Sequence, residues 1–215
     1  GESGCGKSTI AGILAAKNRG YSGEITIGGV PLNAVNEENL MQKVVLVRHN
    51  SYLFKGTVEE NLKMAKPDAT KEEMEAVLQK VNLLGFLQTQ DGLQTQLLEK
   101  ASNLSGGQCQ RLVIARALLR TDSAVYIFDE AASNIDVESE ELIMNVIHEL
   151  AKTKTVLLIS HRLANVVKSD KIYFLKDGEI KESGKHDELM KQNGAYRHLY
   201  ESQMALENYG KGGMA

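Results

Sequence analysis

Short runs of β-branched and apolar residues, separated by stretches with helical periodicity, constrain the fold of this chain more than any other feature of its sequence. Strands that alternate with helices are typical of α/β proteins, in which helices cover the faces of a largely parallel sheet. The sequence therefore predicts an α/β fold with one such sheet and flanking helices. The candidate strands are residues 24–27, 44–47, 124–128, 155–159, 171–175 and 179–182.

The strand signals disappear between residues 58 and 120, where helical patterns replace them. Thr70 is a suitable N-cap, and Glu73 three positions later completes the pattern of a capping box. Apolar side chains then recur at helical spacing, at Met74, Val77, Leu78 and Val81. These patterns predict an α-helical subdomain, residues 58–120, inserted between two strands of the core.

The remaining residues, 1–57 and 121–203, are predicted to form the core of a single domain. Apolar and polar residues alternate around Asp177 and Gly178, a dipeptide that favours the tight turn of a β-hairpin. From about residue 185 the pattern becomes helical. The last six residues of the sequence are GKGGMA, and we expect residues 204–215 to form a flexible tail.

Composition excludes several classes of protein. The 215 residues are 42% hydrophobic and 25% charged, as in ordinary globular proteins, which excludes a disordered or fibrous chain. The formal net charge of −3 gives no bulk attraction to nucleic acid or to an anionic membrane surface. Apolar runs fall well short of the roughly 18 residues of a membrane helix, so we expect no direct lipid insertion by this segment. Two cysteines, Cys5 and Cys109, are too few for a disulfide scaffold and favour a reducing, cytosolic setting.

Residues 1–8 match the pattern G-x-x-x-x-G-K-[ST] of a phosphate-binding loop. In such a loop, glycines let backbone N–H groups turn toward the phosphates, and the following helix presents its positive end to the same anion. Lys7 adds a positive charge for the β- and γ-phosphates, and the Ser8 hydroxyl is suited to Mg²⁺. The alternative is an ordinary flexible turn. The candidate ATP-binding residues are Gly1, Ser3, Gly4, Cys5, Gly6, Lys7, Ser8 and Thr9.

Two adjacent carboxylates follow the most strand-like run, AVYIFDE. Ligands of parallel α/β sheets bind at the carboxyl ends of the strands. Asp129 is placed to hold Mg²⁺ through its water shell, and Glu130 to orient and polarise the water that attacks the γ-phosphate. An isolated pair of acids after a strand is otherwise the start of a solvated loop.

Residues 104–108 read LSGGQ and lead into a helix with one apolar face. The phosphate loop, this segment, the strand that ends in two acids, and a lone His161 after another strand occur in an order that resembles the nucleotide-binding domain of ABC transporters. The similarity runs from residue 1 to about residue 203. It implies a P-loop NTPase core, with ATP and Mg²⁺ as cofactors, in a chain that begins within the phosphate loop.

The resemblance implies that LSGGQ binds the ATP held by a second such domain, so that two domains pair as a homo- or heterodimer around the nucleotide. Ser105, Gly106, Gly107 and Gln108 would meet the γ-phosphate at a helix N-terminus. Asp136 would contact the phosphate loop of the partner domain. On local signals alone, Ser105 and Asp136 are simply N-caps of the helices that follow them.

His161 matches the switch histidine of the family, which contacts the γ-phosphate and supports Glu130; a lone histidine after a strand is otherwise an ordinary surface residue. The segments SYLFKGTVEENL, DEAASNID and SHRLANV resemble the exporter type, whose domains are fused to membrane-spanning helices. Glu99 resembles the exporter acid that touches the coupling helices of the transmembrane domain. That domain is then expected upstream of residue 1.

Position 49 departs from the family pattern, because His49 stands where a glutamine usually ligates Mg²⁺. Mg²⁺ prefers oxygen ligands, so His49 is a poorer ligand beside Ser8 and Asp129. Either Asn50 or a bridging water could take its place. Without the upstream strand and the aromatic residue that stacks on adenine, the chain alone is expected to bind ATP weakly.

Three functions are compatible with the sequence. The first is an ATPase domain of an exporter, at the cytoplasmic face of the cell membrane, with an unknown transported substrate. The second is a soluble ABC-type protein that acts on nucleic acid or ribosomes, although coiled-coil arms and tandem cassettes are not visible here. The third is a nucleotide-gated module with weak turnover, which His49 favours and the intact Glu130 and His161 oppose.

Overall fold

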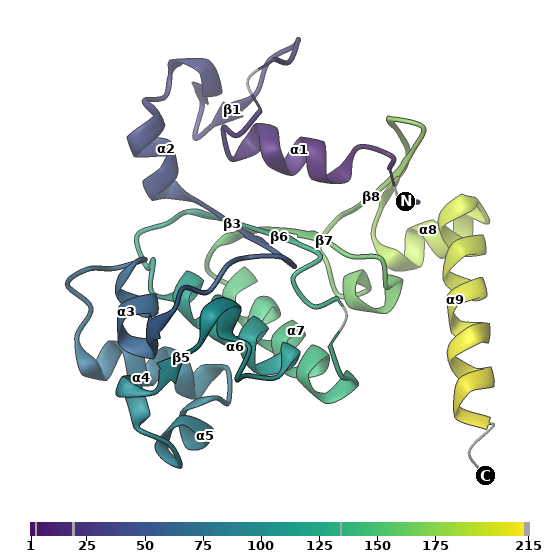
Figure 1. Ribbon diagram of the computed structural model, residues 1–215. Helices are drawn as coiled ribbons and strands as arrows, with labels where there is room; N and C mark the ends of the chain where they lie inside the picture. Colours follow the sequence, from purple (N-terminus) through teal and green to yellow (C-terminus); the bar gives the residue numbers. More distant parts are fainter. Residues whose placement is uncertain (3, 19, 134, 213–215) are drawn as a thin grey trace. The chain divides into compact units, whose positions relative to one another are not determined.

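A computed structural model describes residues 1–2, 4–18, 20–133 and 135–212. Its contacts divide the chain into two compact units (Figure 1). We call Ala11–Leu158 the middle unit, and Gly1–Ile10 together with Ile159–Ala215 the terminal unit. Each unit is described by itself.

The middle unit contains most of the secondary structure. Helix α1 begins in the terminal unit and ends in the middle unit, and strand β7 ends on the first residue of the terminal unit. In chain order the elements are α1 (Lys7–Leu14), β1 (Thr26–Ile27), β2 (Val30–Pro31), η1 (Leu32–Ala34), α2 (Glu37–Lys43), β3 (Val44–Arg48), β4 (Gly56–Thr57), α3 (Val58–Lys63), α4 (Lys71–Lys80), α5 (Leu84–Gln88), η2 (Gly92–Gln94), β5 (Gln96–Leu97), η3 (Glu99–Ala101), α6 (Gly106–Leu118), β6 (Val125–Asp129), α7 (Val137–Ala151) and β7 (Thr155–Ile159).

The predicted parallel sheet is present as a three-stranded sheet in the order β3-β6-β7. Strands β3 and β6 run parallel, with Val44 opposite Val125 at one end and Arg48 opposite Asp129 at the other. Figure 1 shows α6 and α7 on one face of this sheet. The α/β prediction and the strands expected at 44–47, 124–128 and 155–159 are therefore confirmed.

The expectation of a single sheet is wrong. The other described strands form three separate two-stranded sheets, β1-β2, β4-β5 and β8-β9, all antiparallel. The strand expected at 24–27 is reduced to β1, which turns back into β2 at Gly28 and Gly29, with φ values of 59° and 80°. Glycine adopts this left-handed conformation at little cost, so a local hairpin forms in place of an additional parallel strand.

Helices dominate between β4 and β6, as predicted. Thr70 caps α4 through the expected capping box with Glu73, and Thr57 caps α3 through a second one with Glu60. The departure is β5, which lies within the predicted helical region and pairs with β4. The boundaries of the proposed helical subdomain at residues 58 and 120 stay a prediction.

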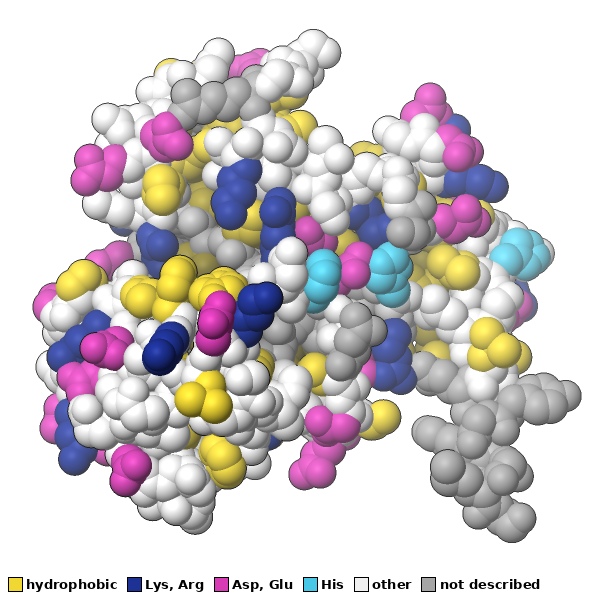
Figure 2. Space-filling model, in the orientation of Figure 1, with side chains coloured by type: hydrophobic (Ala, Val, Ile, Leu, Met, Phe, Trp, Pro, Cys, Tyr) yellow, Lys and Arg dark blue, Asp and Glu magenta, His cyan; other side chains and the backbone are white. Residues whose placement is uncertain are grey.

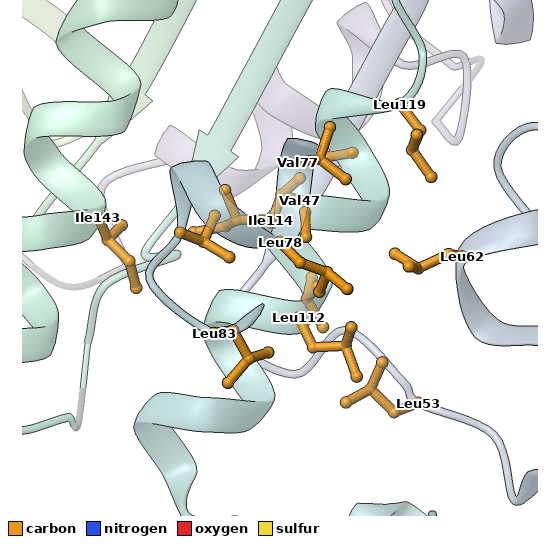
Figure 3. Packing of buried hydrophobic residues seen from close by; sticks show 14 of the residues in the cluster. Val47, Leu53, Leu62, Val77, Leu78, Leu83, Leu112, Ile114, Leu119 and Ile143 are labelled. Atoms are coloured by element: carbon orange, nitrogen blue, oxygen red, sulfur yellow. The ribbon is translucent and has the colours of Figure 1, made fainter. Parts of the chain in front are cut away.

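The core of the middle unit is formed where these helices meet the sheet. Leu62 of α3, Leu78 of α4 and Leu112 of α6 belong to one buried cluster, and all three are fully buried; Figure 3 shows Leu78 and Leu112 side by side, with Leu62 pointing toward them. Tyr126 and Phe128 of β6 add two stacked aromatic rings with centroids 6.4 Å apart. Burial of one such large apolar side chain stabilises a fold by roughly 2 kcal/mol, so this cluster holds the end of β6 in place.

The terminal unit contains η4 (Leu163–Val166), β8 (Ile172–Lys176), β9 (Glu179–Gly184), α8 (His186–Gln192) and α9 (Ala195–Gly212). The hairpin predicted at Asp177 and Gly178 is confirmed, because both residues adopt positive φ values, 52° and 78°, between paired strands. Helix α9 continues to Gly212, within the segment 204–215 for which a flexible tail is predicted, and that flexibility stays a prediction. Within the described ranges, no helix combines the length and apolar character needed to cross a bilayer.

Candidate functional site

The loop before α1, in the terminal unit, has the geometry that its glycines predict. Gly4 and Gly6 adopt φ values of 81° and 102°, which L side chains rarely reach. The helix begins at Lys7, and the Ile10 amide donates to the Gly6 carbonyl at 3.1 Å to close its first turn. Ser8 and Thr9 are exposed on that turn. The predicted residue Ser3 lies outside the described residues.

The Lys7 side chain turns back into this loop. Its Nζ donates to the Gly1 carbonyl at 2.9 Å and to the Glu2 carbonyl at 2.6 Å, and lies 3.5 Å from the Cys5 sulfur. Cys5 is buried, and Gly1 lies so close to the Leu175 carbonyl that an added Cβ would be 1.9 Å from it. A positive charge beside a helix N-terminus within a glycine-rich turn is suited to binding a phosphate.

The two predicted carboxylates lie at the end of β6 in the middle unit. Asp129 is the last residue of the strand and only 4% exposed. Glu130 follows with a φ of 55°, an uncommon conformation for a residue with a side chain. Its carbonyl accepts hydrogen bonds from the Ser133 amide at 3.1 Å and the Ser133 hydroxyl at 2.8 Å, which hold the turn.

The parallel register brings His49 to the same edge of the sheet as Asp129. The His49 amide donates to the Asp129 carbonyl at 3.2 Å, and the His49 and Asn50 side chains are exposed. Of the predicted metal ligands, the structure therefore brings His49 and Asp129 together within the middle unit. Ser8 belongs to the terminal unit.

The donor atoms partly fit Mg²⁺. Mg²⁺ is commonly bound by one carboxylate, with phosphate oxygens and water completing its coordination, and Asp129 suits this role. The imidazole of His49 is a poor ligand for this ion. In the part of the chain that the structure describes, no group of three or more His, Cys, Asp or Glu side chains could hold a metal by itself.

Arg48 is a neighbour of Asp129 that the sequence analysis missed. Its Nε lies 3.8 Å from the Asp129 carboxylate oxygen Oδ2, and this Nε is buried without a hydrogen-bond partner. The signal for it was present, because parallel pairing of the two predicted strands places Arg48 opposite Asp129. A cation therefore faces the carboxylate that is predicted to hold the metal.

The LSGGQ segment forms the N-terminus of α6. The Ser105 hydroxyl accepts from the Gln108 amide at 3.2 Å, and the Gln108 side chain accepts from the Ser105 amide at 2.9 Å, a complete capping box. Ser105 and Gly106 are exposed, and a Cβ added at Gly106 would meet nothing within 4 Å. The local N-cap interpretation of Ser105 is confirmed, and the positive end of α6 also remains open to a ligand.

Gly107 packs this helix end against the start of α7. A Cβ at Gly107 would be 2.6 Å from the Ser139 hydroxyl and 3.0 Å from Asp136 Oδ2. Asp136 caps α7, accepting from the Ser139 amide at 2.8 Å. That backbone hydrogen bond, then the side-chain hydrogen bond to Ser139, lowers the pKa of Asp136. Two helix N-termini therefore lie together on the middle unit, with an ionised carboxylate beside the glycines.

His161 is exposed in the turn that follows β7, in the terminal unit. Its backbone carbonyl accepts a hydrogen bond from Gln203 Nε2 at 2.7 Å. Gln203 belongs to α9, and the sequence analysis did not single it out because nothing in the local pattern marks it.

A group of exposed apolar residues lies on the middle unit, and Figure 2 shows hydrophobic side chains gathered on its surface. Tyr52 and Phe54 are 43% and 47% exposed and meet edge to face with ring centroids 4.8 Å apart. In the pairing of β4 with β5, Gly56 lies opposite Leu97, so the exposed Leu98 and the neighbouring Glu99 follow the end of β5 that faces the start of β4, just after Phe54. An exposed apolar group beside a carboxylate is typical of a contact surface for another protein.

Comparison with known proteins places these features in a family. The sequence model of the ABC transporter family matches residues 1–133. An uncharacterized ABC transporter ATP-binding protein from Haemophilus influenzae is 50% identical over 207 residues, which cover 96% of this chain and 37% of that protein. The ATP-dependent lipid A-core flippase of Vibrio vulnificus is 42% identical over 205 residues, 94% of this chain and 35% of the flippase.

One solved structure shares both the fold and part of the sequence. The structure of a bacterial Atm1-family ABC exporter with ATP bound matches with a TM-score of 0.88 and 31% identity, covering 94% of this chain and 35% of the exporter chain. The chain thus spans about a third of the length of the relatives that it matches.

Proposed function

Because the chain belongs to the ABC transporter family, as an ATP-binding domain similar to those of exporters, we propose that it pairs with a second such domain around Mg-ATP and hydrolyses the nucleotide to drive transport. The observation that carries this proposal is the open N-terminus of α6. Ser105 and Gly106 are exposed there, and no neighbouring atom lies where a Cβ of Gly106 would project. Such an end attracts the phosphate of a nucleotide brought by another domain.

In this proposal the residues of the phosphate loop bind the nucleotide and those after β6 act on water. The Lys7 ammonium moves from the loop carbonyls to the phosphate oxygens, which are stronger acceptors. Mg²⁺, held by Ser8 and Asp129, would neutralise phosphate charge. Glu130 orients the water and takes its proton as the water oxygen bonds to the γ-phosphorus and the bond to the β-γ bridging oxygen breaks, which leaves ADP and phosphate. His161 would contact the γ-phosphate.

The apolar group of Tyr52, Phe54 and Leu98, with Glu99, is the proposed contact with the transmembrane domain of the transporter. Their exposure as a group supports this, because an apolar patch on the surface is stabilised when a partner protein covers it. The domain would then work at the cytoplasmic face of a membrane.

A nucleotide-gated module with weak turnover is a second candidate, because the pairing of Arg48 with Asp129 and the imidazole at position 49 both weaken the metal site. Phosphate release by the full-length protein separates the two. Glu130→Gln should lower the rate at least about a hundredfold, whereas Glu141→Gln, an exposed glutamate on α7, should leave it unchanged. Equal rates for the wild type and the Glu130 variant would overturn the hydrolytic assignment.

Pairing around ATP is tested by Gly106→Arg, because the space around this residue lets the fold accept a side chain. The introduced side chain should occupy the space of the phosphate of the nucleotide bound to the partner domain, and phosphate release should therefore fall. ATP should still bind to the phosphate loop. Ser102→Arg, at an exposed position shortly before α6, is the matched control. Unchanged turnover in Gly106→Arg would contradict the shared site.

A further inference from the structure

One side chain of α9 makes two hydrogen bonds to the turn that contains His161. Gln203 Nε2 donates to the His161 carbonyl at 2.7 Å, and Gln203 Oε1 accepts from the Leu163 amide at 2.9 Å. Both ends of the side-chain amide are therefore used, and they hold two backbone groups that flank Arg162. No other residue type of similar length offers a donor and an acceptor in this arrangement.

The position of Gln203 is itself fixed at the start of α9. The Glu182 carboxylate of β9 accepts from the Ala195 amide at 2.6 Å and from the Tyr196 amide at 3.3 Å, which caps the helix. A carboxylate at a helix N-terminus also meets the positive end of the helix dipole. The strand β9 therefore determines where α9 begins.

Tyr196 then fixes the rotation of the helix. It is fully buried, and its hydroxyl lies 2.8 Å from His186 Nδ1. Burial, and then the nearby Tyr200, raises the pKa of Tyr196 to about 12, so the hydroxyl keeps its proton. Tyr196, Tyr200 and Gln203 follow one another at spacings of four and three, which places them on one face of a helix. The anchored face of α9 is thus the face that presents Gln203.

The turn also has internal hydrogen bonds, and these do not reach α9. The Ser160 hydroxyl accepts from the Arg162 amide at 3.1 Å and donates to the Arg162 carbonyl at 3.0 Å, and Asn165 Nδ2 lies 3.3 Å from the same oxygen. These bonds shape the turn locally. The Gln203 amide, in contrast, joins the backbone of the turn directly to α9.

We propose that Gln203 is a positioning residue for His161, holding the backbone of the turn so that the imidazole is presented to the γ-phosphate in one fixed place. The inference rests on the proposed role of His161 in hydrolysis. A side chain that is displaced by about 1 Å loses much of its contribution to a reaction, and loss of a group that orients a reacting residue typically costs about ten- to a hundredfold in activity.

The test uses full-length protein carrying Gln203→Leu, which has similar volume and no hydrogen-bonding groups. We expect kcat for ATP hydrolysis to fall about tenfold or more with KM changed less than about twofold. The Leu163 amide, which loses its acceptor, should exchange its hydrogen faster. Ser202→Ala, the neighbouring exposed position on α9, is the control and should change neither quantity.

Combining Gln203→Leu with His161→Ala distinguishes positioning from general damage. If Gln203 acts through His161, the double variant has the kcat of His161→Ala alone. Independent, multiplicative losses would overturn the proposal, and so would faster Leu163 exchange with unchanged kcat. Full activity of His161→Ala would instead refute the role of His161 in the proposed function, whereas a large loss in His161→Ala with none in Gln203→Leu would refute only the positioning role.

Discussion

Arg48 offers the sharpest test of the metal site, because it places a positive charge against the carboxylate that we assign to Mg²⁺. Its Nε lies 3.8 Å from Asp129 Oδ2, and the two side chains are 36% and 6% exposed. A metal ion that approaches Asp129 meets this guanidinium and must displace or tolerate it. Replacement of Arg48 by glutamine removes the charge and keeps most of the side-chain length.

The magnitude follows from the distance and the exposure. At 3.8 Å, two unit charges attract by about 1 kcal/mol in water and by about 4 kcal/mol at the effective dielectric constant near a protein surface. Solvent reaches more than a third of the arginine, so the lower value is the better guide. A change of about 1 kcal/mol corresponds to about a fivefold change in the dissociation constant of the metal.

We therefore expect Arg48→Gln to bind Mn²⁺, a spectroscopic substitute for Mg²⁺, about fivefold more tightly in the presence of ATP, as measured by electron paramagnetic resonance on the full-length protein. Arg48→Lys keeps the charge and should stay close to the wild type. Without metal, the glutamine variant should also unfold more easily by about 1 kcal/mol, since Asp129 loses a counter-charge, and Mg-ATP should restore most of this difference. Weaker or unchanged Mn²⁺ binding would refute the reasoning.

Two further predictions concern the contact between α6 and α7. Gly107→Ala should lower the free energy of unfolding by about 1–3 kcal/mol in urea titrations, because its Cβ would lie 2.6 Å from the Ser139 hydroxyl, while Gly106→Ala, with open space around it, should lose no stability. The lowered pKa of Asp136 means that this carboxylate stabilises the fold above the pKa of the unfolded chain, about 3.9, and that the contribution disappears as pH falls through the lower, folded value. The free energy of unfolding of Asp136→Asn should therefore fall less steeply between pH 5 and pH 2 than that of the wild type. Parallel pH curves for the two proteins would contradict the assignment of this pH dependence to the Asp136 cap.

Local signals in the sequence predicted the elements whose causes are local. The capping box at Thr70 and the hairpin at Asp177 and Gly178 depend on residues next to one another, and both are present. The strand β5 was missed because only its pairing with β4, distant in the sequence, makes it a strand.

The candidate site follows the same division. Residues of the phosphate loop and of LSGGQ are consecutive, so a motif was enough to single them out. Arg48 required the register of two strands, and Gln203 required the docking of a helix whose sequence carries no mark of that contact. Side chains that position others are therefore the part of a site that a sequence motif conveys least.

The parallel pairing of β3 with β6 fixes the position of residue 49 through its backbone, independently of its side chain. Position 49 is held beside Asp129 through its own backbone amide, 3.2 Å from the Asp129 carbonyl, and not through its imidazole. The side chain at position 49 can therefore change, from histidine to an amide or the reverse, and alter the ligand atoms available to a metal ion. The position of the residue beside Asp129 stays the same. A single substitution at this position can thus change the affinity of the domain for a metal ion without any change in the pairing of its strands.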